Sequence, residues 1–555
     1  MKDTYDYALG TYSRAVSTGS TDAQLWFDRG LIWCYGYHHE ESEVCFRRAA
    51  DADPNCAMAH WGIAYVAGPN YNKPWEVFDE KDLVATLRNA YQAAQSALQR
   101  APSSTPVEQA LIGALARRYH SDHPVDDFSI WNDDYANAMR EVYGAFPDDM
   151  DVCTLFAEAL MNRTPWDLWN LDTGEPTEGA DTAEAIEVLE RALAKNDELG
   201  FERHPGLLHM YIHLMEMSPH PERALVAGDR LRGLVPDAGH LEHMPTHIDV
   251  QCGDYLSTVL SNSDAIVADR KYLEREGAIN FYSGYRVHNY HFKVFGAMLL
   301  GHYGAAMEGA DELVETVPEE LLRLESPPMA DFVESYVSIR MHAMIRFGRW
   351  QDIIDEPMPV DRDLYCNTVA INHYAKTVAH AATGDVAAAE RESAEFQAAM
   401  TNVPESRMLF NNTCNELLVI AHEMQRGEIE YRKGNYDAAF KHLRRSVELD
   451  DGLPYSEPWG WMQPTRHALG ALLLEQNHME EATAVYRADL GLDDSLRRAM
   501  QHMENVWSLH GLHECLVRLG RHDEAAMLRP RLNVALARAD VPIKSSCFCR
   551  LHQAA

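Results

Sequence analysis

Histidine pairs spaced by one helical turn are the residues of this chain best suited to do chemistry. His209 and His213 lie four residues apart, and Glu216 follows three residues later. In a helix all three side chains would share one face. Two imidazoles at this spacing can bind one metal ion, and zinc metalloproteases use the same spacing with a glutamate between the histidines. That glutamate is missing here, so the segment predicts a metal ligand pair but not a metalloprotease.

Two more histidine pairs follow along the chain. His243 and His247 repeat the four-residue spacing with Pro245 between them, and His288 and His291 are three residues apart. Proline is tolerated in the first turn of a helix. We therefore expect His247 just inside a helix and His243 on the loop that enters it.

The histidines are unevenly distributed along the sequence. Nine of the 27 lie between residues 204 and 291. Helical units that stack in order bring equivalent positions side by side, so these pairs are expected to converge. Imidazole-rich sites favour Zn, Cu or Fe over Mg or Ca. The sequence therefore predicts a transition-metal cofactor with the ligands His209, His213, His243, His247, His288 and His291.

The number of bound ions stays open at this point. A single Zn, Fe or Cu with four ligands is the simplest arrangement, and two clusters of three histidines could instead hold a coupled dicopper pair. Each pair could also pack as half-buried polar aromatic residues without any ion.

Two further side chains are candidates for catalytic roles. Glu216, or its neighbour in the next block, Glu242, could be a ligand, a hydrogen-bond partner of a ligand, or a general base. Arg466 follows a Trp-Gly-Trp segment and could bind an anionic group of a substrate. A surface salt bridge is the alternative role for this arginine.

The elements that must position these residues are helices. Apolar residues recur with helical periodicity in most windows, and alternating strand patterns are nearly absent. The clearest block, residues 427–449, has tetratricopeptide repeat (TPR) spacing. Gly427 would allow close helix approach, Gly434 would form the turn, Tyr436 and Ala439 would join the helices, and Leu443 would lie on the inner face of the second helix.

The same offsets recur elsewhere in the chain. Units starting at residues 427, 470 and 513 are 43 residues apart, and a further copy opens the chain. Their marker residues are Gly470, Asn477, Met479, Ala482 and Tyr486, then His513, Gly520, His522 and Ala525, and near the start Gly30, Phe46, Ala49 and Pro54.

We therefore predict an all-α, TPR-like helical-repeat solenoid, a superhelix curled around a central pocket. Its expected blocks are N-terminal repeats over residues 1–200, a histidine-rich centre over 201–330 and C-terminal repeats over 331–555. Loops rich in Trp, Pro and Gly are expected to fold toward the pocket.

Composition excludes two classes of partner. The chain has 85 acidic and 49 basic residues, a formal charge of −36, so it is not expected to bind nucleic acid. No apolar stretch is long enough for a membrane span and no basic leader precedes an apolar run, which predicts a soluble, cytoplasmic protein. Its ten cysteines are scattered, as in reduced proteins. Only Cys547 and Cys549 form a local pair, expected as two free thiols or a soft-metal site.

These blocks resemble large stand-alone TPR proteins of bacteria and fungi over nearly the whole chain. The resemblance rests on residues 56–62 and 68–72, Leu155 to Asn162 with Trp166, the three histidine pairs, residues 464–470 and Trp507-Ser-Leu. It implies the helical-repeat fold and marks His209, His213, His243, His247, His288 and His291 as a functional core. It supplies no reaction.

Two functions of different classes follow. The first is a metal-dependent enzyme that acts on a small molecule in a histidine-lined pocket, by oxidative or hydrolytic chemistry. The second is a TPR scaffold that binds a protein or peptide partner without catalysis. The scarcity of lysine, with ten residues, and the Trp- and Pro-rich loops weigh against a peptide groove.

Overall fold

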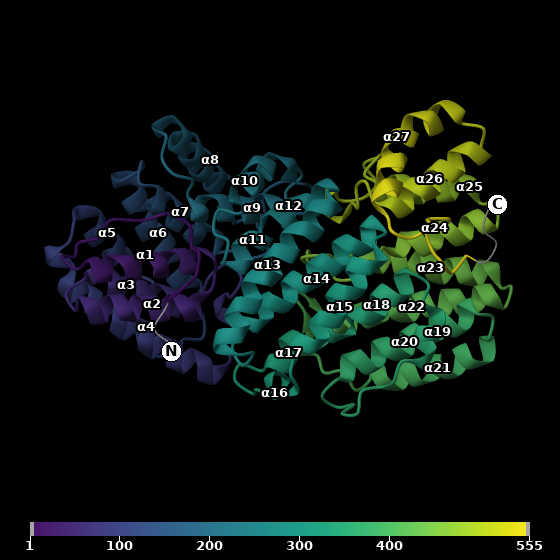
Figure 1. Ribbon diagram of the computed structural model, residues 1–555, viewed down its shortest axis with the longest axis horizontal. Coiled ribbons are helices and arrows are strands. Elements are labelled where there is room, and N and C mark those ends of the chain that lie inside the picture. Colours follow the sequence, from purple (N-terminus) through teal and green to yellow (C-terminus); the bar gives the residue numbers. More distant parts are fainter. Residues whose placement is uncertain (1–4, 551–555) are drawn as a thin grey trace. The chain divides into compact units, whose positions relative to one another are not determined.

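The computed structural model describes residues 5–550, and its regular secondary structure is almost entirely helical (Figure 1). The strands of this part are β1 (Met408–Leu409) and β2 (Asn412–Thr413), which form one short antiparallel pair. The all-α prediction is confirmed. Among the described residues, no helix combines the length and apolar character needed to cross a membrane.

The chain divides into two compact units. Unit 1 comprises residues up to Ile248 together with Asp264–Gly277, and unit 2 comprises Asp249–Ser263 and the residues from Ala278 onward. The division falls inside the predicted central block, 201–330. The three-block organisation stays a prediction.

Unit 1 is built from consecutive helices joined by loops, the longest of which lies between Met161 and Thr182. Its helices are α1 (Thr21–Tyr35), α2 (His39–Ala52), α3 (Ala57–Ala67), α4 (Glu80–Arg100), α5 (Pro106–Leu115), α6 (Ser129–Ala145), α7 (Met150–Met161), α8 (Thr182–Leu199), α9 (Pro205–Glu216), α10 (Leu225–Leu231) and α11 (Gly239–His243). The boundary between the units falls in α12 (Pro245–Cys252) and α13 (Tyr255–Glu276).

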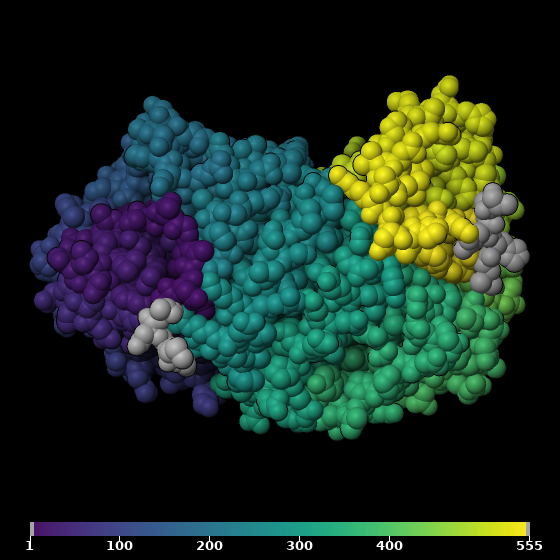
Figure 2. Space-filling view, in the orientation of Figure 1, coloured from purple at the N-terminus to yellow at the C-terminus, as the bar shows by residue number. Residues whose placement is uncertain are grey.

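Unit 2 continues the same arrangement of paired helices. Its helices are α14 (Ser283–Leu300), α15 (Tyr303–Thr316), α16 (Glu319–Leu322), α17 (Met329–Val333), α18 (Ile339–Arg346), α19 (Trp350–Asp355), α20 (Cys366–Ala382), α21 (Val386–Met400), α22 (Cys414–Arg432), α23 (Tyr436–Asp451), α24 (Thr465–Glu475), α25 (Met479–Asp489), α26 (Val506–Arg518) and α27 (His522–Arg538). Helices α24 to α27 are coloured from green to yellow in Figures 1 and 2.

Glycines on first helices let a large side chain of the second helix lie close to the backbone. A Cβ atom on Gly30 or Gly62 would lie 2.8 or 2.5 Å from the ring of Phe46. In unit 2, a Cβ atom on Gly470 or Gly511 would lie 2.5 or 2.3 Å from the ring of Tyr486. The same close packing in both units confirms the TPR-like spacing.

The turns between paired helices also agree with the sequence. Gly434 has a φ of +80°, and Asn477, at the equivalent position of the next repeat, has a φ of +65°. Asparagine tolerates this left-handed conformation better than most residues, which explains how it replaces the turn glycine.

The C-terminal segment differs from the expectation of free thiols. Cys547 and Cys549 form a disulfide, and Cys549 is buried. The other eight cysteines are free, as predicted. The Ser546 hydroxyl donates a hydrogen bond to the backbone carbonyl of His467, and the Arg550 guanidinium pairs with Glu514. These contacts hold the C-terminal segment against the helices of unit 2.

Candidate metal centre

Helix α9 carries the first histidine pair and is buried along its whole length. Pro205 occupies its first turn, and Nδ1 of His204 accepts a hydrogen bond of 3.1 Å from the Leu207 N–H. This caps an amide that has no partner within the helix. Nε2 of His204 lies 3.2 Å from the Asp151 carboxylate on α7, which fixes the start of the helix.

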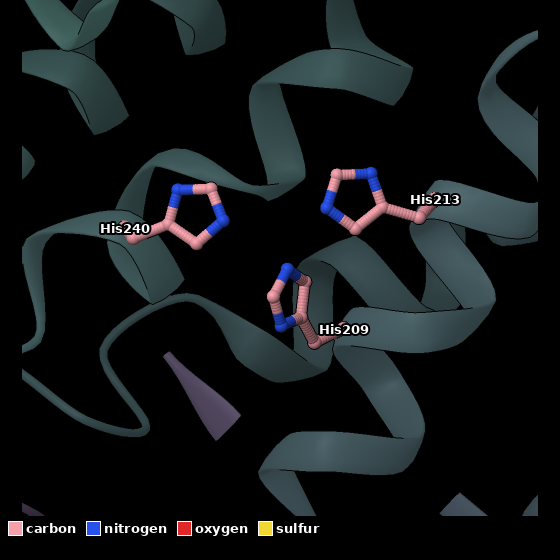
Figure 3. Close-up of side chains that lie close together, drawn as sticks. All are labelled: His209, His213 and His240. Carbon is pink, nitrogen blue, oxygen red and sulfur yellow. The ribbon is translucent and has the colours of Figure 1, made fainter. Parts of the chain in front are cut away.

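Three imidazoles of unit 1 converge on one buried position. His209 and His213 from α9 and His240 from α11 each offer one ring nitrogen, and these nitrogens all lie within 4.8 Å of one another. Figure 3 shows the three rings directed at the space between them. A tetrahedral ion holds its nitrogen ligands about 3.3 Å apart, so small side-chain adjustments would complete a site. We call His209, His213 and His240 the histidine triad.

Hydrogen bonds to groups outside the triad decide which ring nitrogens can bind a metal ion. Nδ1 of His209 donates to the Tyr35 carbonyl at 2.6 Å, a carbonyl at the C-terminal end of α1. Nδ1 of His213 lies 2.8 Å from Oε1 of Glu216. Both contacts place the proton on Nδ1 and the lone pair on Nε2, the arrangement typical of metal-binding histidines. Nε2 of His209 is buried and has no hydrogen-bond partner among the described residues.

Burial keeps His209 and His240 uncharged. Desolvation lowers the pKa of His209 to about 3, although its bond to the Tyr35 carbonyl acts in the opposite direction. Burial and the neighbouring histidines hold the pKa of His240 well below its ordinary value. Neutral imidazole is the form that binds metal ions, so these two side chains need no deprotonation at neutral pH.

The Tyr37 ring covers one side of the triad. Its centroid lies 4.6, 6.0 and 5.7 Å from the centroids of His209, His213 and His240. Tyr37 has a φ of +52°, an uncommon backbone conformation for a bulky residue, and is buried. Such strain is often found at functional sites, and here it directs the ring against the triad.

The second histidine pair lies behind the triad in a hydrogen-bonded chain. Glu216 is fully buried and bridges His213 to Nδ1 of His247. Nε2 of His247 lies 2.7 Å from Nε2 of His243. This separation is that of a hydrogen bond and is shorter than the spacing of about 3.3 Å on a tetrahedral ion.

His243 does not lie on a loop. It is the last residue of the short helix α11, and α12 begins two residues later at Pro245. Met244, between them, keeps a helical conformation, and proline without an N–H group fits the first turn of the next helix. Glu242, the other candidate carboxylate, accepts a hydrogen bond of 2.9 Å from the Gly233 N–H.

The remaining predicted site residues belong to unit 2. Nε2 of His288 lies 3.9 Å from Oε2 of Glu457. The His291 ring packs edge-on against Tyr336, and burial lowers the pKa of His291 to about 3. Their ligand roles stay predictions.

Arg466 forms an ion pair within unit 2. Its Nη2 donates to Oδ2 of Asp451 at 2.7 Å, and a second bond joins Nη1 to the same carboxylate. This pairing occupies one edge of the guanidinium. A catalytic role for Arg466 stays a prediction.

His240 was not among the ligands predicted from the sequence. The available signal was its own one-turn spacing to His243 in Gly239-His-Leu-Glu-His243. Gly239 also matters, because a Cβ atom there would lie 2.0 Å from Oδ1 of Asp269 on α13. Glycine at this position therefore favours close packing of α11 on α13.

Comparison with known proteins finds similar solved structures at low scores only. No family model and no curated protein matches the chain. The chain is similar to the Rap protein complexed with competence and sporulation factor, with 13% identity, 65% of this chain and 94% of that chain covered, and a TM-score of 0.31. It is also similar to yeast Tom70, with 11% identity, coverage of 92% and 99%, and a TM-score of 0.29.

A third similar structure is the human IFIT1 dimer with m7Gppp-AAAA, with 10% identity, coverage of 95% and 92%, and a TM-score of 0.29. These neighbours are TPR-like helical-repeat proteins. At such low scores they carry no argument about activity. The class defined by fold and site is thus an all-α, TPR-like helical-repeat protein with buried histidine groups that could hold a metal ion.

Proposed function

We propose that this protein is a metal-dependent enzyme that acts on a small molecule, with a transition-metal ion held by the histidine triad. One observation carries the proposal: three buried imidazoles from α9 and α11 direct ring nitrogens at one position. The tautomers of His209 and His213 favour ligation through Nε2. Three histidine ligands leave further coordination positions on an ion, as catalytic sites require.

An ion bound there would supply Lewis acidity or redox chemistry, which fits either hydrolytic or oxidative catalysis. Imidazole ligands suit Zn, Cu or Fe. Glu216 would orient His213 and increase its basicity as a ligand. Tyr37 would shield one side of the site from water.

The second histidine pair would support the first. His247 binds Glu216 and His243 binds His247, so both would hold the carboxylate in the geometry that His213 needs. A wider form of the proposal adds further residues to the site. It includes direct metal ligation by His243, His247, His288 and His291 and anion binding by Arg466. Their alanine variants, measured for metal content, separate direct ligands from residues that only support the triad.

The test is the metal content of protein purified without a histidine tag. We expect stoichiometric Zn, Cu or Fe in the wild type and none in His209→Ala. His220→Ala is the matched control, because the His220 side chain in unit 1 is 64% exposed. Circular dichroism checks that each variant folds. Metal retained in folded His209→Ala would overturn the site.

The TPR-like fold also fits a scaffold that binds a peptide in its groove. The same experiment addresses this alternative. A wild type without any transition metal, together with capture of a defined peptide partner, would replace the enzyme proposal by the scaffold.

A further inference from the structure

A second group of buried polar atoms in unit 1 has no role in holding a metal ion. Glu158 on α7 and Asn162, one turn further, are 5% and 6% exposed, and Arg118, just after α5, is 1% exposed. Hydrogen-bond partners are missing, among the described residues, for Oε1 of Glu158, for both amide atoms of Asn162 and for Nε and Nη1 of Arg118. We call these three residues the Glu158 cluster.

So many unsatisfied buried atoms in one unit need an explanation. Native proteins satisfy nearly all of their buried polar groups, with protein, water or ligand. The unsatisfied atoms include acceptors on Glu158 and Asn162 and donors on Asn162 and Arg118. The missing partner must therefore offer both donors and acceptors.

Two tyrosines connect the Glu158 cluster to the histidine triad. Tyr37 is close enough to Glu158 to lower the pKa of its carboxyl group, and the Tyr37 ring contacts all three triad imidazoles. The Tyr71 backbone also lowers the pKa of Glu158, and the Tyr71 ring centroid lies 5.1 Å from that of His213. A molecule bound at the cluster would thus be one side chain away from the triad.

The two charges of the cluster, on Arg118 and Glu158, have opposite signs. Nη2 of Arg118 donates to the Pro69 carbonyl at 2.6 Å, and its guanidinium lies over the rings of Tyr65 and Tyr135. Burial raises the pKa of Glu158, while bonds from hydroxyl groups and the charge of Arg118 partly offset this effect. Within the described residues, no hydrogen bond joins the Glu158 carboxylate to the Arg118 guanidinium.

A buried charge is stable only with a partner, and here each charge has atoms left over. An isolated anion or cation would leave one of the two charges unmatched. A molecule with a positive and a negative group a few bonds apart matches both. The smallest common group with these properties is the zwitterionic α-amino-acid group.

We propose that the Glu158 cluster binds the α-amino-acid group of the substrate, with the ammonium at Oε1 of Glu158, the carboxylate at Arg118 and the Asn162 amide bonding beside them. As a statement about the substrate, it rests on the metal site proposed above. Binding itself needs no metal ion, so the two proposals can be tested separately.

The first test uses metal-free wild-type protein and the standard α-amino acids in thermal-shift and calorimetric titrations. We expect at least one amino acid to bind. Its amide, which lacks the carboxylate, and its desamino acid, which lacks the ammonium, should bind about tenfold more weakly or worse. No binding by any amino acid, or equal binding of the three forms, would overturn the proposal.

The second test uses variants. Glu158→Gln should weaken binding of the amino acid about tenfold and leave binding of the desamino acid unchanged. Glu178→Gln is the matched control, because Glu178 is exposed in the same unit. Equal affinity of wild type and Glu158→Gln for the amino acid would contradict the proposal. If Glu158→Gln fails to fold, the analogue series with the wild type decides.

Metal analysis of the same samples separates this proposal from the previous one. Amino-acid binding by a wild type that never holds metal would support the cluster and reject the metal centre. Stoichiometric metal without amino-acid binding would support the metal centre and reject the amino-acid site at the Glu158 cluster.

Discussion

Each unit buries a group of histidines, but their ring nitrogens are used differently. In unit 2, the buried Asp489 carboxylate takes hydrogen bonds from His467 at 3.0 Å and His502 at 2.9 Å, and also from Asn505 and Ser508. We call these five residues the Asp489 network. Among the residues that the structure describes, no carboxylate belongs to the histidine triad of unit 1, and the ring nitrogens of the triad face one another.

The difference shows what distinguishes a candidate ligand site from a structural histidine cluster. Burial is the same in both, since His209 and His467 are at most 1% exposed. In unit 2, the central charge belongs to the protein, and the histidines satisfy it. In unit 1, the protonated nitrogens point outward to Tyr35 and Glu216, so a central positive charge would have to come from an ion.

The largest effect is expected from removing the central charge of unit 2. Asp489→Asn should lower the free energy of unfolding by roughly 3 to 5 kcal/mol, because a buried charge that loses its partner is strongly destabilising. The affected partner is Arg346, which binds His467 at 2.8 Å and whose pKa burial lowers to about 9. Chemical denaturation followed by tryptophan fluorescence measures the change.

Asp494→Asn is the control for this variant, because Asp494 is exposed in the loop that follows α25. It should change stability by no more than about 0.5 kcal/mol. Equal effects of the two variants would show that the Asp489 network is not a structural centre. Metal content should be unchanged in both.

Adding a metal ion should stabilise the histidine triad of unit 1 and leave the Asp489 network of unit 2 unchanged, whereas Asp489→Asn affects unit 2. At an ion concentration about one hundred times the Kd, binding stabilises the native state by about 2.7 kcal/mol, which slows opening about a hundredfold. We expect hydrogen exchange of the α9 and α11 amides to slow by this amount with the preferred ion of Zn, Cu or Fe. Peptides from α25 and α26 should be unaffected. Equal slowing in all four helices would contradict a site confined to the triad.

The Glu216 carboxylate provides a graded test of the triad. Glu216→Gln keeps the shape of the side chain but weakens the bonds to His213 and His247, so metal affinity should fall about 10- to 100-fold. Competition with a chelator of known affinity measures the loss. Glu242→Gln is the matched control, because Glu242 is also buried but bonds to the Gly233 backbone. Unchanged affinity in Glu216→Gln would remove Glu216 from the site.

The helical-repeat fold was predictable because its signals are local. Gly470 and Tyr486 are sixteen residues apart, as are Gly30 and Phe46, and both pairs make the close contact that this spacing predicts. The left-handed turn at Asn477 was predictable for the same reason. Such signals depend only on neighbouring helices, so they can be recognised without knowledge of how the rest of the chain folds.

The triad was only partly predictable, because its third member comes from another helix. His209 and His213 follow from one-turn spacing on α9. The approach of His240 depends on the packing of α11, which includes the contact between Gly239 and Asp269. Spacing in the sequence contains no information on that contact. The Glu158 cluster was invisible for a similar reason, since Arg118 and Glu158 meet only in the folded unit.

The smallest effect concerns pH. The pKa of His209 is about 3 in the folded protein, against an ordinary value of about 6.5, so unfolded chains bind the extra proton between these values. Stability contributed by neutral His209 is therefore complete above pH 6.5 and is lost as the pH falls, by about 1.4 kcal/mol per pH unit. Asp489 has the opposite type of charge and a pKa held well below its ordinary range, because its histidine partners outweigh the effect of burial. Its contribution falls only below about pH 4.

In metal-free protein, His209→Gln should therefore flatten the stability profile between pH 6 and 5 by about 1.4 kcal/mol, whereas exposed His220→Gln should leave the slope of the wild type. Denaturant titrations at both pH values measure the slopes, and identical slopes for the two variants would show that His209 does not control the acid sensitivity of unit 1.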